Sequence, residues 1–260
     1  MTTAQTTLMR QRAQLLDICA DLRADQWRTM SAARPWQVRD VVAHLGATCR
    51  DAFGPRLGAL VFGTAVEHAN DDAVIRWRKK TPAEVVREYA RWSGVFAAVY
   101  DRTASTPVGA VPLRLADLGW YPIRLLPDIL VFDHHVHLHY DIAPVIGLSL
   151  PEPDEATMSS VLRWMLAGLE QMNASDMRFV DRPLRLELTG PGCGSWTISP
   201  CGDGRLRVTD DQRDAAVAIH AKAVEFPEWA TTRAPWRERA VELSGDREYG
   251  ERFLDHLRII

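Results

Sequence analysis

Four of the eight histidines lie between His134 and His139, in a run that starts at Asp133 and reads Asp-His-His-Val-His-Leu-His. Residues four apart on an α-helix share a face, so a helix here would pair Asp133 with His137 and His135 with His139. Either pair could supply two ligands to a divalent metal ion. The alternative is a set of exposed or internally hydrogen-bonded histidines, and periodicity alone does not choose between these interpretations.

His44 is a further candidate ligand. It follows Val41 by three positions and adjoins Leu45, at the edge of the apolar face of another predicted helix, so it should point inward. Two imidazoles and a carboxylate from two facing helices would suit zinc or another late divalent ion, with open positions for water or substrate. For His44 alone, the alternative is an interior histidine with ordinary hydrogen bonds.

Amphipathic helices must position these side chains. Apolar residues recur at helical spacing in residues 8–22, 35–51, 81–102, 127–143 and 161–172. Thr81 and Glu84 have the spacing of a capping box at the start of the third segment. The fourth segment carries two polar stripes with apolar residues between them, which is typical of a helix central to a bundle with a stripe facing an internal cavity.

The apolar period changes from near 3.6 to two beyond residue 150. The stretch 182–211 alternates apolar and polar residues between glycine-rich turns, and 214–221 continues the pattern. We therefore expect a helical domain over residues 1–150 and a smaller α+β domain over residues 151–260. Its sheet should be antiparallel, with strands around Leu186, Trp196 and Val217, and the first half should contain no strands.

Composition excludes several classes of protein. The 260 residues include 31 Lys and Arg against 34 Asp and Glu, a net charge of −3, which argues against a nucleic-acid partner. No apolar run reaches the roughly 20 residues that span a bilayer, and the first residues do not resemble a signal peptide. We expect a cytoplasmic protein that does not bind membranes; the sequence leaves its oligomeric state undetermined.

The four cysteines have no recognisable reactive context. Cys19, Cys49, Cys193 and Cys201 form no CxxC pair, and four in a chain of this length do not make a secreted disulfide framework. They are expected to be reduced, and no role is assigned to them.

Residues 35–45, which read PWQVRDVVAHL, resemble the W-x-V-x-D-V-V-A-H-L signature of the mycothiol-dependent maleylpyruvate isomerase family. This family belongs to the DinB-like superfamily of metal-binding four-helix bundles. Four later segments, SWTISP, DAAVAIHA, AVEFPEWATTR and VELSGDREYGERFLDHL, are similar to the family's C-terminal domain, of sterol-carrier-protein-like α+β type. The resemblance implies a DinB-like bundle followed by such a domain.

The resemblance also implies a ligand set. In the family, the signature histidine and a later acidic residue with a histidine four positions on bind a metal, and these positions correspond to His44, Asp133 and His137. The family has a glutamate where this chain has the shorter Asp133. His134, His135 or His139 could therefore replace Asp133 as ligand, and zinc is the expected metal.

The reaction implied by the resemblance is a metal-dependent, mycothiol-using isomerisation or thiol S-transfer on a small electrophile. A non-catalytic module that binds a ligand or partner, or a metal enzyme that uses no thiol, are the alternatives. Arg233 is the candidate catalytic residue, because it or Arg239 could pair with a carboxylate of substrate or thiol at the domain junction; both could instead be surface arginines. The pocket should lie between the helices that carry His44 and His137, open toward the second domain, and be lined by Tyr140 or Trp36.

Overall fold

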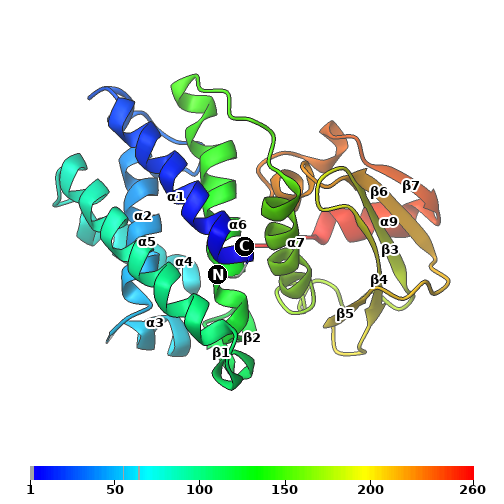
Figure 1. Ribbon diagram of the computed structural model, residues 1–260. Coiled ribbons are helices and arrows are strands. Elements are labelled where there is room, and N and C mark those ends of the chain that lie inside the picture. The colour runs from blue at the N-terminus through cyan, green and yellow to red at the C-terminus, as the bar shows by residue number, and fades with distance from the viewer. Residues whose placement is uncertain (1–2, 55, 64) are drawn as a thin grey trace. The chain divides into compact units, whose positions relative to one another are not determined.

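Four helices lie side by side in the N-terminal half of the chain (Figure 1). They are α1 (Thr3–Asp21), α2 (Val38–Asp51), α5 (Pro82–Ala104) and α6 (Leu126–Val136). Helix α2 packs on α5, and α1 packs on both α5 and α6. This computed structural model describes residues 3–54, 56–63 and 65–260. The chain divides into two compact units, Met1–Pro151 and Glu152–Ile260, and the predicted order of a helical region followed by a sheet-containing domain is confirmed.

The apolar stripe of α2 enters the core of the first unit. Val41, Val42 and Leu45 have no exposed surface and pack in one cluster with Tyr89 of α5 and Leu138. Burying each of these aliphatic side chains contributes roughly 1.5–3 kcal/mol. Because this burial fixes the rotation of α2, the side chain of the neighbouring His44 also points into the unit.

Polar side chains fix where two of the helices begin. The backbone N–H of Thr81 donates to Glu84 Oε2 at 2.7 Å and that of Glu84 to Thr81 Oγ1 at 3.3 Å, which confirms the predicted capping box of α5. Helix α2 starts at Val38, later than predicted, because Asp40 accepts a hydrogen bond from the N–H of Gln37 at 3.1 Å. Trp36 therefore lies in the turn before the helix.

The first unit contains elements that the apolar pattern does not predict. Helices α3 (Leu57–Phe62) and α4 (Val66–Trp77) follow α2, and strands β1 (Pro112–Leu115) and β2 (Gly119–Pro122) form an antiparallel hairpin. The expectation of no strands in the first half is therefore wrong. Four-residue strands are too short to show a clear period of two, and the buried residues of α4, Ala73, Val74 and Trp77, all lie near its C-terminal end.

Helix α6 continues into a π-helical turn at His137–Ile142. The N–H of Ala143 donates to the carbonyl of Leu138 at 3.0 Å, five residues earlier in the chain. A short 3₁₀ turn at Pro144–Ile146 and Gly147, whose φ is 70°, end the segment. The continuous α- and π-helical run thus ends at Ile142, before Pro144, as predicted.

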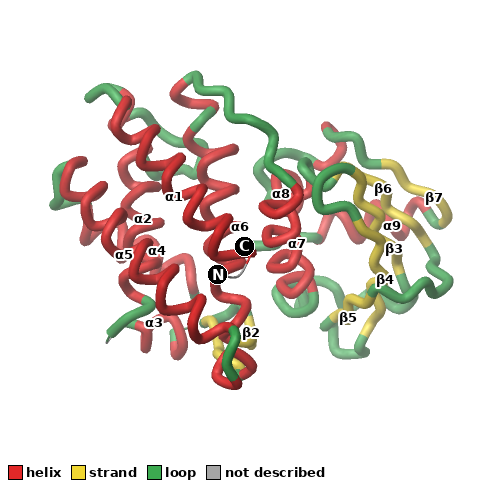
Figure 2. The backbone as a smooth tube through the Cα atoms, viewed as in Figure 1, coloured by secondary structure: helices red, strands yellow, loops and turns green. Residues whose placement is uncertain are grey.

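The second unit holds a five-stranded sheet (Figure 2). Its strand order is β5-β4-β3-β6-β7, and the strands are β3 (Leu184–Thr189), β4 (Gly194–Pro200), β5 (Leu206–Thr209), β6 (Val217–Lys222) and β7 (Glu242–Gly245). Strands form around Leu186, Trp196 and Val217, as predicted. The expected antiparallel pairing is present in β3–β4, β4–β5 and β6–β7, but β3 and β6 are parallel. The chain passes through β4 and β5 on one side of β3 before it crosses to the other side, so β6 runs in the direction of β3.

Three helices accompany this sheet: α7 (Glu155–Leu169), α8 (Phe226–Ala230) and α9 (Arg247–His256). Helix α7 begins earlier than the predicted residue 161 because Asp154 caps it, accepting from the N–H of Thr157 at 2.9 Å. Helix α7 contacts β5, and α9 contacts β6 and β7. Burial alternates along β3 and β6, so one face of the sheet is apolar and buried while the other carries polar, partly exposed side chains. Among the described residues, no helix combines the length and hydropathy needed to cross a bilayer.

Candidate metal centre

The structure brings His44 of α2 together with Asp133 of α6 and His137 of the π-helical turn. One potential ligand atom from each residue lies within 4.8 Å of the others, and within the described part of the chain this is the group of His, Cys, Asp and Glu side chains close enough to share a metal ion. The carboxylate is central. His44 Nε2 lies 3.4 Å from Oδ1 and 3.3 Å from Oδ2 of Asp133, and His137 Nε2 lies 3.3 Å from Oδ1.

The charges in this cluster favour an ionised Asp133, whose side chain is 19% exposed. Burial alone raises the pKa of Asp133, but the charges and hydrogen bonds of His44 and His137 outweigh it and hold the pKa well below its usual value. The carboxylate is thus in the form that binds a cation.

His137 is held from both sides by carboxylates. Its Nε2 faces Asp133, and its Nδ1 donates to Asp141 Oδ2 at 2.7 Å. Burial lowers the pKa of His137, but the hydrogen bonds to Asp133 and Asp141 outweigh it and raise the pKa to about 9. Donation from Nδ1 to a carboxylate fixes the ring and leaves Nε2 as the atom available to a metal ion.

His44 has different surroundings. Its Nδ1 is buried and has no hydrogen-bond partner among the described residues. Its ring centroid lies 5.0 Å from that of Trp36 and 5.0 Å from that of His137. The Trp36 indole N–H donates to Asp71 of α4 at 2.9 Å, which positions the indole beside the cluster. Packing rather than a second hydrogen bond therefore orients the His44 ring.

Of the competing histidines, His134 has no free nitrogen. Its Nδ1 donates to the Leu130 carbonyl at 2.7 Å, and its Nε2 accepts from the hydroxyl of Tyr89 at 2.9 Å. Burial lowers the pKa of His134 to about 4, so the ring is neutral near pH 7. His134 is thus a hydrogen-bonded core residue and a poor substitute for Asp133.

His135 and His139 form the second predicted pair, with ring centroids 4.5 Å apart. The hydroxyl of Tyr140 lies 3.5 Å from His135 Nε2. Burial lowers the pKa of both rings, to about 4 for His139. In the described chain, no third His, Cys, Asp or Glu joins this pair in a group that could share a metal ion.

Arg233 and Arg239 both lie in the second unit. Arg233 is exposed and follows α8, where its N–H donates to the Glu228 carbonyl at 2.9 Å. Arg239 makes two hydrogen bonds of 2.7 Å to the carboxylate of Glu228, so this guanidinium is engaged in an ion pair. A catalytic role for Arg233 stays a prediction.

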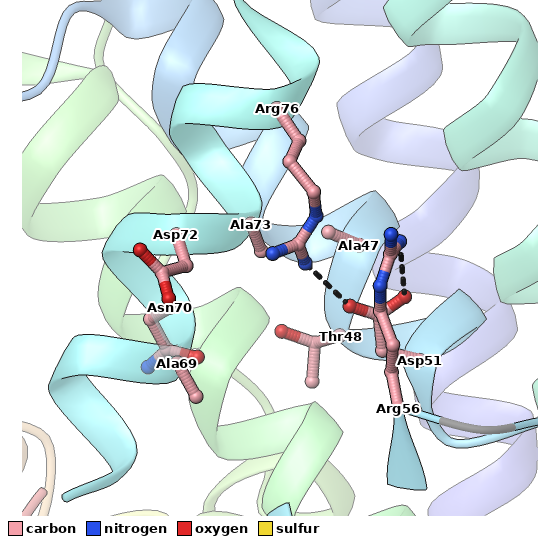
Figure 3. A pocket seen from close by; sticks show the side chains of 9 residues that line it. All are labelled: Ala47, Thr48, Asp51, Arg56, Ala69, Asn70, Asp72, Ala73 and Arg76. Atoms are coloured by element: carbon pink, nitrogen blue, oxygen red, sulfur yellow. Dashed lines mark hydrogen bonds and ion pairs between the residues drawn. The ribbon is translucent and has the colours of Figure 1, made fainter. Parts of the chain in front are cut away.

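A pocket of about 140 Å³ lies beside α2, on the side of α4 (Figure 3). Arg76 pairs with Asp51 at 3.0 Å, and Arg56 lies 3.9 Å from the same carboxylate. Because Asp51 faces both arginines, their charges are partly neutralised. The predicted pocket between the helices of His44 and His137 is a different one and stays a prediction.

The contacts of Asp141 and Trp36 with this cluster do not follow from the sequence pattern alone. For Asp141, the available signal is its spacing of four residues from His137, which places both on one helical face. Trp36 belongs to the signature but lies in a turn, where helical periodicity does not predict the direction of a side chain.

Comparisons with known proteins agree with this architecture. Residues 8–141, just over half of the chain, match the family described as Mycothiol maleylpyruvate isomerase N-terminal domain. A crystal structure of the mycothiol-dependent maleylpyruvate isomerase matches with a TM-score of 0.58 and 14% identity, over 94% of this chain and 93% of that chain. A histidine-to-alanine mutant of that isomerase gives a TM-score of 0.56 with the same identity and coverage.

Two further comparisons complete these findings. The UbiJ-SCP2 ubiquinone synthesis protein matches 38% of this chain and 91% of its own, with 18% identity and a TM-score of 0.30. A search of curated proteins gives no match. The isomerase structures show the shared fold. The segment that matches the family, residues 8–141, includes His44, Asp133 and His137. The chain belongs to the mycothiol maleylpyruvate isomerase N-terminal domain family.

Proposed function

We propose that the protein is a metal-dependent, mycothiol-using enzyme, an isomerase or a thiol S-transferase, acting on a small electrophilic substrate. The observation that carries this proposal is the convergence of His44, Asp133 and His137 from two helices, with Asp141 behind His137. Family membership supports the thiol, because the similar solved structures are of a mycothiol-dependent isomerase.

The residues present fit a divalent ion of the zinc type. Two imidazole nitrogens and one carboxylate are a donor set that zinc prefers, and three protein ligands leave a position for substrate or water. Asp133 is ionised, and its oxygens already lie within 3.5 Å of both Nε2 atoms, so the shorter side chain reaches the histidines. When bound, such an ion would supply Lewis acidity, which lowers the pKa of a thiol or polarises a carbonyl.

Each side chain of the cluster has its own task in this proposal. His44 and His137 present Nε2 toward the shared centre, and Asp133 supplies the negative charge between them. Asp141 holds the proton of His137 on Nδ1, which keeps Nε2 unprotonated in the neutral ring. Trp36 lies against the His44 ring, where its indole limits the access of water to that ligand.

The chain's cysteines do not suit the role of nucleophile. Cys19 and Cys49 are buried, and burial raises the pKa of Cys19 to about 12 and that of Cys49 still further. Cys193 and Cys201 are exposed, and among the described residues neither belongs to the group of side chains that could share a metal ion. An external thiol therefore provides the sulfur: as an isomerase, the protein would add it to an activated double bond, allow rotation about the resulting single bond and then expel it. A transferase would stop after addition, and Arg233 would pair with a carboxylate of either reactant.

Zinc content and thiol-dependent turnover of maleylpyruvate test this proposal together. We expect about one zinc per chain, activity only with mycothiol, and loss of both zinc and activity in His44→Ala and His137→Ala. His68→Ala, at an exposed position of α4, is the matched control and should behave as the parent.

The other outcomes separate the remaining interpretations. If the parent chain binds no zinc after the metal is added, or if all variants bind it equally, the cluster is not a metal centre and the binding-module interpretation replaces the proposal. If zinc binds but turnover of an electrophile is independent of thiol, the protein is a metal enzyme of another kind.

A further inference from the structure

Strands β3, β6 and β7 are neighbours in the second unit's sheet (Figure 1). Three polar side chains, one from each strand, form a row on the partly exposed face of this sheet. His220 Nδ1 of β6 lies 3.0 Å from Glu187 Oε2 of β3, and His220 Nε2 lies 3.0 Å from the hydroxyl oxygen of Ser244 of β7. The contact with Glu187 is an ion pair, and the contact with Ser244 is a hydrogen bond. The imidazole thus bridges a carboxylate and a serine hydroxyl.

The strand register produces this row. Glu187 and His220 are directly opposite each other in the parallel β3–β6 pair, and Ser244 is opposite Ala218, two residues before His220. Side chains two apart on a strand share a face, so all three residues lie on the same face of the sheet. The whole row belongs to the unit Glu152–Ile260, whereas His44, Asp133 and His137 belong to the unit Met1–Pro151.

The carboxylate decides which nitrogen of His220 carries the proton. Glu187 can only accept hydrogen bonds when ionised, so the neutral imidazole carries its proton on Nδ1. Its Nε2 is then an acceptor, and the hydroxyl of Ser244 donates to it. In acyl transfer, a serine is activated when its hydroxyl is hydrogen-bonded to a base and a third group orients that base. Ser244, His220 and Glu187 have this arrangement.

The backbone after Ser244 adds a donor. Asp246 donates its N–H to the Ala216 carbonyl, so in the alternating antiparallel ladder Ser244 also faces β6 while the N–H of Gly245 points away from it. Gly245 has a φ of 97°, and a Cβ there would lie 2.5 Å from the Ala216 oxygen, so the turn requires glycine. The N–H of the residue after a nucleophilic serine is a common oxyanion donor.

The row is accessible. The side chains of His220 and Glu187 are 39% and 36% exposed, and Ser244 is exposed at the edge strand of the sheet. Along β3 and β6, buried apolar residues alternate with Glu187 and His220. The row therefore lies on the partly exposed face of the sheet and not on its buried, apolar face. A small acyl donor can therefore reach the hydroxyl of Ser244 directly.

We propose that Ser244, His220 and Glu187 form a second reactive site, in which Ser244 is acylated by small activated esters. The Ser244 oxygen bonds to the carbonyl carbon as its proton moves to His220 Nε2, and the bond from that carbon to the alkoxy group breaks. The alkoxide leaves with the proton from Nε2. Water then attacks the acyl carbon, gives a proton to Nε2, and releases the acid as the proton returns to the Ser244 oxygen. Glu187 is a positioning residue that acts through His220.

The experiment uses p-nitrophenyl acetate as the probe, with the full-length chain in EDTA so that no metal ion contributes. The release of nitrophenolate is followed, and the acetylated residue is identified by mass spectrometry of peptides from quenched samples. We expect acetyl groups on Ser244 in the parent chain and none at position 244 in Ser244→Ala. In His220→Gln the rate of Ser244 acetylation should fall by about 10²-fold, the lower end of the range for a general base.

Three variants provide the controls. Ser195 on β4 is opposite Glu187, and its buried hydroxyl has no hydrogen-bond partner among the described residues, so Ser195→Ala should leave Ser244 acetylation unchanged. Glu187→Gln should slow acetylation about tenfold, whereas Glu187→Asp, which keeps the charge, should restore part of the rate. His44→Ala should react as the parent does, which separates this site from the proposed metal centre.

Thermal unfolding of each variant confirms that it is folded before its rate is compared. Absence of acetyl-Ser244 in the folded parent overturns the proposal, and so does acetylation of Ser244 that is equally fast in His220→Gln.

Discussion

His137 and Asp141 are joined by a buried hydrogen bond of 2.7 Å between Nδ1 and Oδ2, within the π-helical turn that ends α6. In the proposed metal centre, His137 would bind the ion through Nε2 and Asp141 would fix the orientation of the His137 ring. Because the two residues are four positions apart, one helical segment would supply both the ligand and its support.

Asp141→Asn should weaken zinc binding by about 10–100-fold, the usual cost of losing the carboxylate behind a metal-binding histidine. The neutral amide no longer stabilises the proton on His137 Nδ1, so Nε2 becomes a weaker donor. Zinc titration against a competing chelator measures the change. Asp72→Asn, at an exposed position of α4, is the matched control, and equal affinities in the two variants would contradict a role for Asp141.

Asp133→Glu should retain zinc, whereas Asp133→Asn should lose most of its affinity. The carboxylate lies within 3.5 Å of both Nε2 atoms, so charge at this position is essential and one additional methylene can be accommodated by rotation of the longer side chain. Removing one of three ligands, and the only anionic one, should lower the affinity at least about 100-fold. The same chelator competition gives the answer, and zinc binding by Asp133→Asn at parental affinity would exclude the carboxylate as a ligand.

Gly46 and Gly94 should respond in opposite ways to alanine. A Cβ at Gly46 of α2 would lie 3.0 Å from the Trp77 ring and 3.2 Å from the backbone of Tyr89, so Gly46→Ala should destabilise the protein by about 1–3 kcal/mol. A Cβ at Gly94 of α5 would have Arg12 as its nearest neighbour at 4.0 Å, so Gly94→Ala should stabilise by about 0.5–1 kcal/mol. Urea unfolding measures both. Equal effects would show that α2 does not pack as closely as the structure indicates.

The metal-free protein should lose stability as the pH rises from about 6.5 to about 9. The pKa of His137 is raised to about 9 in the folded chain, so its proton stabilises the fold fully below the unfolded pKa, and this contribution disappears as the pH passes the folded value. The loss is at most about 3.5 kcal/mol, at roughly 1.4 kcal/mol per pKa unit. Urea unfolding in EDTA across this range, for the parent and His137→Gln, gives the test; the same slope in both would contradict the assignment.

The sequence predicts well what local spacing determines. The capping box of Thr81 and Glu84, the apolar stripe of α2 and the end of the long helical run before Pro144 depend on neighbouring residues, and the structure contains all of them. His44 was predicted to point inward for the same reason.

Contacts between segments far apart in the sequence were harder to predict. The parallel pairing of β3 with β6 depends on the crossing of the chain, since a period of two is the same in both kinds of sheet. The row of Glu187, His220 and Ser244 likewise follows from register across three strands. His134 could be distinguished from a ligand only once its partner Tyr89, on another helix, was known.

The parallel pair also bears on how the second unit forms during synthesis. Strand β3 is at the centre of the sheet, but its partner β6 leaves the ribosome only after β4 and β5. Until then β3 has an unpaired edge, whose N–H and C=O groups can pair with another nascent chain. Pairings between distant segments also form slowly. A chain truncated before Val217 should therefore aggregate more readily than the parent chain, because β6 no longer covers this edge of β3.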